Sequence, residues 1–358
     1  MHIPAVLDVA GPRNDGRLVV AAHGRLLLMD SAGRTSDFAP EYSVPDGPEP
    51  YIALSPGVTV DAAGCSFDRD DVFALDLHDP SPGITKISAD GTVSHLADVG
   101  GVTTLLGIAL DTGGGFGHRL LVIGPTQSGK TQLSAVDCRG TVTTIGAVDT
   151  PLEGGIAVAP STFGRFRGQL IAPDEKSGTI YALSPTGELS TVAAPGAPAG
   201  PDIGVESVGF VPAAGADAAF LADRGGQADP HAGTDSLLRL TGDALTTAGV
   251  RPGDLLVATE GGATVVQVRC ATDCTASVVA TGPPTAHTEG RLLVVTGAEF
   301  RGSPAGGPSS ALPSSASSSS STSSGGSKGR GPLIVIGIAA LAAVGIVVFV
   351  RRRGRRVS

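Results

Sequence analysis

The stretch FGRFRGQLIAPDEKSGTIYALSPTGELSTVA, residues 163–193, decides the fold of this chain. It contains two apolar runs, QLIAPD and TIYALS, and then a tight turn and a third run, ELSTVA. A further short apolar run, GGIAVAP, precedes it at residues 154–160. Short runs of this composition, bounded by Gly and Pro, are typical of β-strands. The segment therefore predicts four short antiparallel strands in succession.

The same unit recurs before residue 302 at a period of about fifty residues, which is typical of a β-propeller blade of four strands. The run equivalent to QLIAPD occurs six times: RLVVAA (17–22), DVFALD (71–76), RLLVIG (119–124), QLIAPD (169–174), AAFLAD (218–223) and DLLVAT (254–259). We therefore predict an all-β, six-bladed β-propeller over residues 1–301.

Two irregularities interrupt the repeat. The sixth unit follows the fifth closely, and TTAGVRPG (246–253) is a poor innermost strand, so we expect the sixth blade to be incomplete. The first blade has no innermost strand of its own at the start of the chain. EGRLLVV (289–295) is expected to supply that strand, because closing the ring removes exposed sheet edges.

The blade at residues 163–193 resembles those of six-bladed propellers related to NHL-repeat and gluconolactonase/regucalcin-like proteins. The resemblance extends over residues 16–296 as architecture, and no blade carries a motif that selects one activity. It implies either a binding platform or a divalent-metal-dependent lactone hydrolase. Because one fold hosts many functions, the architecture does not choose between the two.

The end of the chain has a different composition. Residues 302–331 are rich in Ser, Gly and Pro, which predicts a disordered linker. Residues 332–350 carry no charge, and a helix of this length spans about 28 Å, close to the thickness of a bilayer core. We predict a single transmembrane helix at 332–350, with the lipid bilayer as its partner, and a basic tail at 351–358.

The tail RRRGRR directly after the helix predicts a cytoplasmic C-terminus, since Lys and Arg favour that side. The propeller would then be extracellular, on the cell membrane. This orientation needs a signal, and MHIPAVLDVAGP has neither a basic start nor an apolar core. We expect a start upstream of Met1. The alternative, a tail-anchored cytoplasmic domain, would place the Arg cluster outside.

Charge argues against a nucleic-acid partner. After residue 301 there are seven basic and no acidic residues, which leaves 18 basic and 34 acidic residues before that point. Such an acidic domain repels phosphate backbones. GPTQSGKT (124–131) matches a P-loop pattern, but an alternating strand follows it where a helix is required. We therefore predict a hairpin loop there and no bound nucleotide.

Acidic residues recur where innermost strands begin. In a propeller these starts share one face with the loops that join the second strand of each blade to the third. The chain leaves the ring after an innermost strand, so this face should point away from the membrane. The residues predicted to gather there as ligands for calcium or another divalent cation are Glu49, Glu153, Glu206, Glu289, Asp223, Asp229 and His231. The alternative is a set of solvated loop carboxylates.

His287 lies two residues before Glu289 and is the candidate for general acid–base chemistry. The alternative is a structural histidine that is hydrogen-bonded within its loop. Two functions remain open: a cell-surface domain that binds an unknown extracellular ligand or protein, and a metal-dependent lactone or ester hydrolase at the central channel. The first needs no catalytic constellation and is preferred.

The four cysteines fit an oxidising compartment. Cys270 and Cys274 flank one turn, while Cys65 and Cys138 fall in loops on the same face of neighbouring blades. We predict the disulfides Cys270–Cys274 and Cys65–Cys138. The alternatives are four free thiols in a cytosolic protein or, with less support from the spacing, a zinc site.

Overall fold

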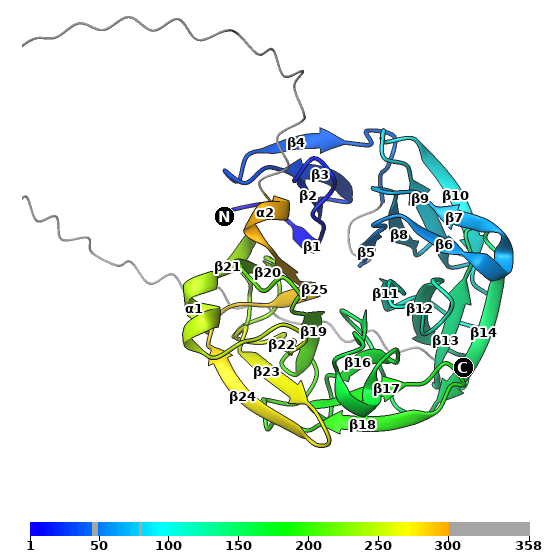
Figure 1. Cartoon of the computed structure of the whole chain (residues 1–358). Helices are drawn as coiled ribbons and strands as arrows, with labels where there is room; N and C mark the ends of the chain where they lie inside the picture. Colours follow the sequence, from blue (N-terminus) through cyan, green and yellow to red (C-terminus); the bar gives the residue numbers. More distant parts are fainter. Residues whose placement is uncertain (45–48, 79–80, 301–358) are drawn as a thin grey trace, which may run out of the picture. The chain divides into compact units, whose positions relative to one another are not determined.

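The computed structural model describes residues 1–44, 49–78 and 81–300, which form six small antiparallel sheets arranged in a ring and one additional two-stranded sheet (Figure 1). The innermost strands contact one another in ring order, and β1 (Val6–Ala10) touches both β5 (Ile52–Leu54) and β25 (Thr288–Val295). The predicted all-β, six-bladed propeller is confirmed.

The first four blades follow the repeat of the sequence, with the innermost strand first. Blade 1 consists of β1 (Val6–Ala10), β2 (Leu18–Ala22), β3 (Arg25–Met29) and β4 (Thr35–Phe38). Blade 2 consists of β5 (Ile52–Leu54), β8 (Val72–Asp76), β9 (Gly83–Ile87) and β10 (Val93–Asp98). Blade 3 consists of β11 (Gly107–Leu110), β12 (Leu120–Pro125), β13 (Thr131–Val136) and β14 (Val142–Val148). Blade 4 consists of β15 (Ala157–Val158), β16 (Leu170–Asp174), β17 (Thr179–Leu183) and β18 (Leu189–Ala193).

The last two blades are interlocked. Blade 5 consists of β19 (Val205–Phe210), β22 (Leu255–Thr259), β23 (Val265–Cys270) and β24 (Cys274–Ala280). Blade 6 consists of β25 (Thr288–Val295), β20 (Ala218–Asp223) and β21 (Ser236–Thr241). The chain therefore lays down the innermost strand of blade 5, makes two strands of blade 6, returns to finish blade 5, and ends with the innermost strand of blade 6.

This alternation of the chain between blades 5 and 6 explains why the sequence of TTAGVRPG does not fit an innermost strand. Its first two residues end helix α1 (Gly242–Thr247), whose first turn is capped by the Thr241 hydroxyl, which accepts from the Ala244 amide at 3.3 Å. The helix stands where a fourth strand would follow β21 and leads the chain back to β22. The innermost strand of blade 5 is supplied by β19, so no strand is needed there.

The ring closes differently from the prediction. Strand β25, which contains residues 289–295, pairs with β20 and is the innermost strand of blade 6. Blade 1 has its own innermost strand, β1, so the expectation that EGRLLVV would serve blade 1 was wrong. The outer edge of blade 6 is covered by the first residues of the chain: the Ile3 amide donates to Asp235 O at 2.8 Å, and the Leu237 amide donates to Met1 O at 2.7 Å. The edge of β21 is thereby covered.

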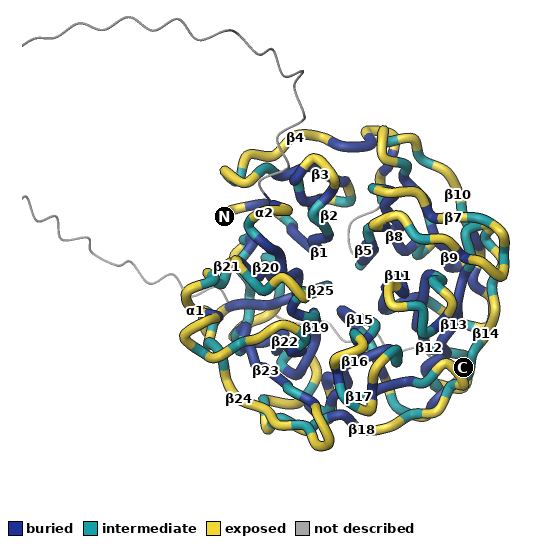
Figure 2. The backbone as a smooth tube through the Cα atoms, viewed as in Figure 1, coloured by how far each residue is buried: buried dark blue, intermediate teal, exposed yellow. Residues whose placement is uncertain are grey.

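Burial explains why the middle strands are apolar throughout instead of alternating. Each lies between two neighbouring blades, so both of its faces are covered, and β2, β16 and β22 are buried at every residue (Figure 2). The outermost strands β10, β14 and β24 border solvent and carry mixed sequences. Aromatic pairs fill the layers between strands, as where the rings of Phe67 and Phe73 meet edge to face at 5.0 Å.

Both predicted disulfides are present. Cys65–Cys138 joins β7 (Cys65–Phe67), in the hairpin that β7 forms with β6 (Val58–Val60) in blade 2, to the β13–β14 turn of blade 3. Cys270–Cys274 closes the β23–β24 turn. The Cys65–Cys138 bond joins blades 2 and 3 on the face where the innermost strands end.

The GPTQSGKT segment forms the ends of β12 and β13 and the turn between them, as the alternating pattern predicted. In the part of the chain that the structure describes, no helix has the length and apolarity needed to cross a bilayer. The predicted linker (302–331), transmembrane helix (332–350) and basic tail (351–358) lie outside the described residues.

Candidate cation site at the channel mouth

One mouth of the central channel holds a cavity of about 130 Å³ that is lined almost entirely by acids. It forms where innermost strands begin and where second strands end. Its lining residues are Glu49, Tyr51, Leu106, Glu153, Gly154, Glu175, Asp202, Glu206, Glu260 and Glu289. We call this the acidic mouth. Strand β25 begins here at Thr288 and runs to the opposite face, where α2 (Gly297–Phe300) follows it.

The structure brings together five of the residues predicted from the sequence. Glu49, Glu153, Glu206 and Glu289 line the acidic mouth, and His287 contacts its wall. Glu206 is 4% exposed and sits at a β-bulge between Val205 and Ser207. Gly154 makes room for it: its φ is +80°, and a Cβ there would lie 2.3 Å from Glu206 Oε1.

Three other predicted residues do not line the cavity. Asp223 is buried, but its carboxylate accepts from the His287 amide at 2.8 Å and from the Thr234 hydroxyl. Asp229 is exposed in the β20–β21 loop, and His231 Nδ1 lies 2.8 Å from Pro284 O. Asp223 therefore holds the backbone of His287 in place and does not line the cavity itself.

Three carboxylates of the acidic mouth lie close to the hydroxyl of Tyr51. It lies 2.6 Å from Glu289 Oε2, 3.2 Å from Glu206 Oε1 and 3.4 Å from Glu49 Oε2. A phenol has one hydrogen to donate, so it satisfies one of these three oxygens at a time. The remaining oxygens need protons or a cation between them. Burial, and then these carboxylates, hold the pKa of Tyr51 well above its ordinary value, so the hydroxyl keeps its hydrogen.

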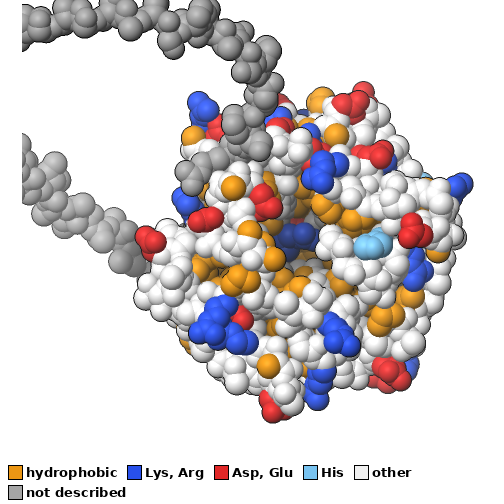
Figure 3. Space-filling model, viewed as in Figure 1, with side chains coloured by type: hydrophobic (Ala, Val, Ile, Leu, Met, Phe, Trp, Pro, Cys, Tyr) orange, Lys and Arg blue, Asp and Glu red, His pale blue; other side chains and the backbone are white. Residues whose placement is uncertain are grey.

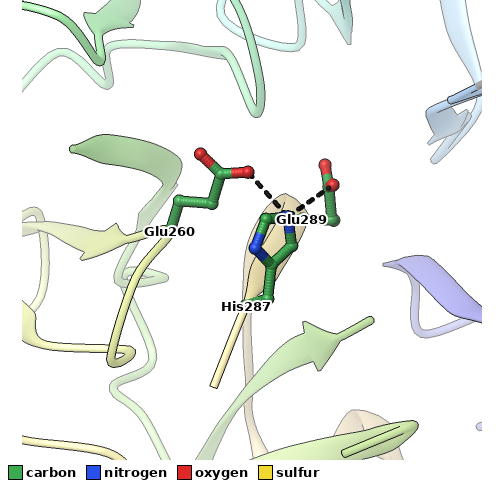
Figure 4. A group of neighbouring side chains, drawn as sticks. All are labelled: Glu260, His287 and Glu289. Atoms are coloured by element: carbon green, nitrogen blue, oxygen red, sulfur yellow. Dashed lines mark ion pairs between the residues drawn. The ribbon is translucent and has the colours of Figure 1, made fainter. Parts of the chain in front are cut away.

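Two cationic side chains contact the acids. Arg224 Nη1 lies 2.6 Å from Glu49 Oε1 and 3.3 Å from Glu289 Oε1. His287 Nε2 lies 2.8 Å from Glu260 Oε1 and 3.3 Å from Glu289 Oε1, so the imidazole sits between two carboxylates (Figure 4). Seven acidic side chains line the cavity, so the negative charge exceeds what these two contacts neutralise.

The excess of acids raises their proton affinity. Burial and then the charge of Glu289 raise the pKa of Glu49 to about 7. Burial and then a hydrogen bond with Glu260 raise the pKa of Glu175 to about 8. Burial and four neighbouring carboxylates hold the pKa of Glu206 well above its ordinary value. The site therefore retains protons at neutral pH, or releases them when a cation arrives.

The pKa of His287 is raised as well, but for an imidazole this favours the charged form. Burial alone would lower its pKa, but hydrogen bonds to Glu260 and Glu289 outweigh burial and raise the pKa to about 10. The imidazole is thus protonated at neutral pH, with Nε2–H directed at the two carboxylates. Its Nδ1 is shielded from solvent and has no hydrogen-bond partner among the described residues.

The donor set fits a divalent cation. Ligand atoms of Glu260, His287 and Glu289 all lie within 4.8 Å of one another. An imidazole nitrogen with two carboxylates suits manganese or zinc, whereas the side of the mouth formed by Glu49, Glu206 and Tyr51 offers only oxygens, as calcium prefers. A metal on His287 must replace the Nε2 proton, because proton and metal use the same lone pair.

Sequence reasoning missed part of the lining, namely Tyr51, Glu175, Asp202 and Glu260, together with Arg224. The repeat itself carried a signal for three of them. Glu175, Arg224 and Glu260 are each the first residue after the second strand of a blade, following β16, β20 and β22. Aligning that position across the blades places all three at the same mouth.

Comparison with known proteins finds distant structural neighbours and assigns no family. No protein-family model matches the sequence, and no curated protein matches it. A chain of the nidogen/laminin complex is 14% identical, with 82% of this chain and 87% of that chain covered and a TM-score of 0.49. A streptogramin B lyase is 13% identical, with 80% and 71% covered and a TM-score of 0.41. A gluconolactonase-like protein is 15% identical, with 49% and 59% covered and a TM-score of 0.31. The β-propeller fold itself is established by the strand order and the ring of innermost strands described above.

Proposed function

We propose that this protein is a membrane-anchored cell-surface β-propeller whose acidic mouth binds a divalent cation and, with it, an extracellular ligand or partner. The observation that carries the proposal is the acidic lining: seven carboxylic side chains around one small cavity, with Arg224 and His287 in contact with them. Carboxylates placed this close repel one another unless protons or cations separate them. A divalent cation is the ligand that relieves this repulsion most effectively.

The size of the cavity favours an ion over an organic substrate. A volume of about 130 Å³ holds an ion and a few waters, at about 30 Å³ per water. When bound, the cation would supply a concentrated positive charge at the mouth of the channel. Glu260, His287 and Glu289 are the first candidates to hold it, and the partner would approach from the open side of the mouth.

The residues around the site keep it in place before any ion binds. Arg224 bridges Glu49 of the loop before β5 to Glu289 of β25, so it fixes two blades across the channel. Asp223 accepts from the backbone of His287 and positions the imidazole. Preorganised carboxylates lower the cost of ordering ligands when the cation arrives.

Isothermal titration of the chelator-treated protein with calcium and with manganese tests cation binding. We expect saturable binding of at least one ion by the natural protein. Glu206→Gln should weaken binding at least tenfold, since one carboxylate is worth on the order of 1.4 kcal/mol or more here. Glu188→Gln, an exposed carboxylate in blade 4, is the matched control and should bind as the natural protein does. Absence of heat with both ions at pH 8 would refute the site.

The surface location rests on the uncharged run at 332–350, the basic tail after it and the two disulfides, which form in oxidising compartments. Labelling intact cells with a membrane-impermeant amine reagent tests it. Labelling of the propeller on intact cells is the expected result. Labelling only after lysis would contradict the orientation.

A lactone or ester hydrolase is the second candidate, because two carboxyl groups of the acidic mouth have a pKa close to neutral. A general base works best when its pKa lies near the working pH, and Glu175, at about 8, meets that condition. His287, with its raised pKa, is suited to donating a proton and not to accepting one. Hydrolysis of small lactones with added metal, lost in Glu175→Gln and kept in Glu188→Gln, would favour the enzyme. No turnover despite metal binding would leave the binding function.

A further inference from the structure

The opposite mouth of the channel has a different chemistry. Two adjoining cavities of about 190 and 670 Å³ open there, and both are lined by Arg291, Leu54, Thr112 and Val294. Figure 3 looks onto this face and shows a central hollow with hydrophobic side chains around it and a basic group on its floor. Ile156 and Phe210 are among the apolar side chains of the smaller cavity, whose wall also exposes polar atoms.

Arg291 is held in the channel by its backbone and not by an ion pair. The carboxylate of Asp8 accepts from the Arg291 amide at 2.9 Å and from the Ile52 amide at 2.8 Å. These backbone bonds join three blades around Asp8. Within residues 1–44, 49–78 and 81–300, no carboxylate lies within 4.0 Å of the Arg291 guanidinium in an ion pair.

The guanidinium is poorly satisfied. It donates from Nη2 to Ile108 O at 3.3 Å, and Nε is shielded from solvent without a hydrogen-bond partner in the described part of the chain. The residue as a whole is half-buried, because part of it borders the hollow, but burial of the charged group is enough to lower the pKa of Arg291 against the opposing charge of Asp8. A guanidinium has five N–H donors, so most of its hydrogen-bonding capacity remains to be filled.

From these observations we propose that this mouth binds an organic monoanion: a carboxylate paired with Arg291, joined to an apolar body that lies against Leu54, Phe210 and Val294. The planar fork of a guanidinium matches a carboxylate, which would fill the free donors and neutralise a buried charge. The combined size of the two cavities is in the range of small-molecule sites. The site is separate from the acidic mouth and has a small excess of positive charge, since three arginines (Arg13, Arg69 and Arg291) and two acids (Asp70 and Glu299) line the larger cavity.

Binding of three small molecules to the natural protein tests separately whether the carboxylate and the apolar body are each needed. Octanoate, below its micelle concentration, has both the anion and the apolar body; 1-octanol lacks the anion, and acetate lacks the body. By isothermal titration we expect saturable octanoate binding that is at least tenfold tighter than either other probe. Equal binding of octanol and octanoate, or no saturable octanoate binding, would overturn the proposal without need of any variant.

Arg291→Met removes the charge and keeps most of the side-chain length, so it should weaken octanoate binding at least tenfold and leave octanol unchanged. Arg25→Met is the matched control and should bind octanoate as the natural protein does, because Arg25 is an exposed cation that lines neither cavity. Glu206→Gln, at the other mouth, should leave octanoate binding unchanged. Unchanged octanoate affinity in a folded Arg291→Met protein, checked by its thermal unfolding, would also reject the proposal.

Discussion

Replacing Glu206 by glutamine removes one charge from the acidic mouth and keeps the shape of the side chain. Glu206 Oε1 and Glu289 Oε2 both lie within 3.2 Å of the Tyr51 hydroxyl oxygen, so they are at most about 6 Å apart. At an effective dielectric constant of about 20, two unit charges at about 6 Å repel by about 3 kcal/mol. At alkaline pH the natural protein must either bear this repulsion or keep a proton on Glu206 at a cost in stability, whereas the glutamine variant does neither.

The effect of Glu206→Gln on the free energy of unfolding depends on pH. The pKa of Glu206 is raised in the folded protein, so the folded state binds more protons than the unfolded chain, and stability falls as pH rises above the ordinary value of 4.5. With a chelator at pH 8, we expect Glu206→Gln to unfold with a free energy about 3 kcal/mol higher than the natural protein, or roughly 5 °C higher in Tm. At pH 5 the gain should be less than about 1 kcal/mol, because Glu206 then keeps its proton at little cost.

Urea denaturation with and without a saturating divalent cation measures both effects, with Glu188→Gln as the control. The cation should stabilise the natural protein more than the variant, because the variant has lost a carboxylate that the cation would neutralise. A variant that is less stable than the natural protein at pH 8 in chelator would refute the reasoning. An equal gain in Glu188→Gln would show that the effect is general and not a property of the acidic mouth.

Four further outcomes are expected. In chelator, the natural protein should lose stability between about pH 4.5 and 8, because Glu175 ionises in the unfolded chain over this range but keeps its proton in the folded protein. A saturating cation should flatten this pH dependence, as measured by urea denaturation. His287→Gln should weaken manganese binding at least tenfold and change calcium binding little, as titration calorimetry would show, since only the nitrogen ligand is lost. Replacing both Cys65 and Cys138 by serine should lower the unfolding free energy by about 4 kcal/mol, because the bond closes a separation of 73 residues. Ile3→Ala should cost about 2–4 kcal/mol in the same assay, since Ile3 is 5% exposed in the core between blades 1 and 6.

The sequence by itself determined the strands, the turns and the repeat, and from these the propeller. It also predicted both disulfides and the meeting of Glu49, Glu153, Glu206 and Glu289. These conclusions depend only on which face of a blade a loop lies on, and strand order along the chain decides that. Glu175 and Glu260 were within reach of the same reasoning, had the position after the second strand been aligned across the blades.

The tertiary structure alone decided which strands pair. Strands β19 and β20 follow one another closely and look like two strands of one blade, yet β19 pairs with β22 and β20 with β25. The anion-binding mouth likewise depends on Asp8 and Arg291, which are 283 residues apart in sequence. Backbone hydrogen bonds are the same for every pair of strands, so a local pattern identifies a strand without naming its partner. Packing around the closed ring makes that choice.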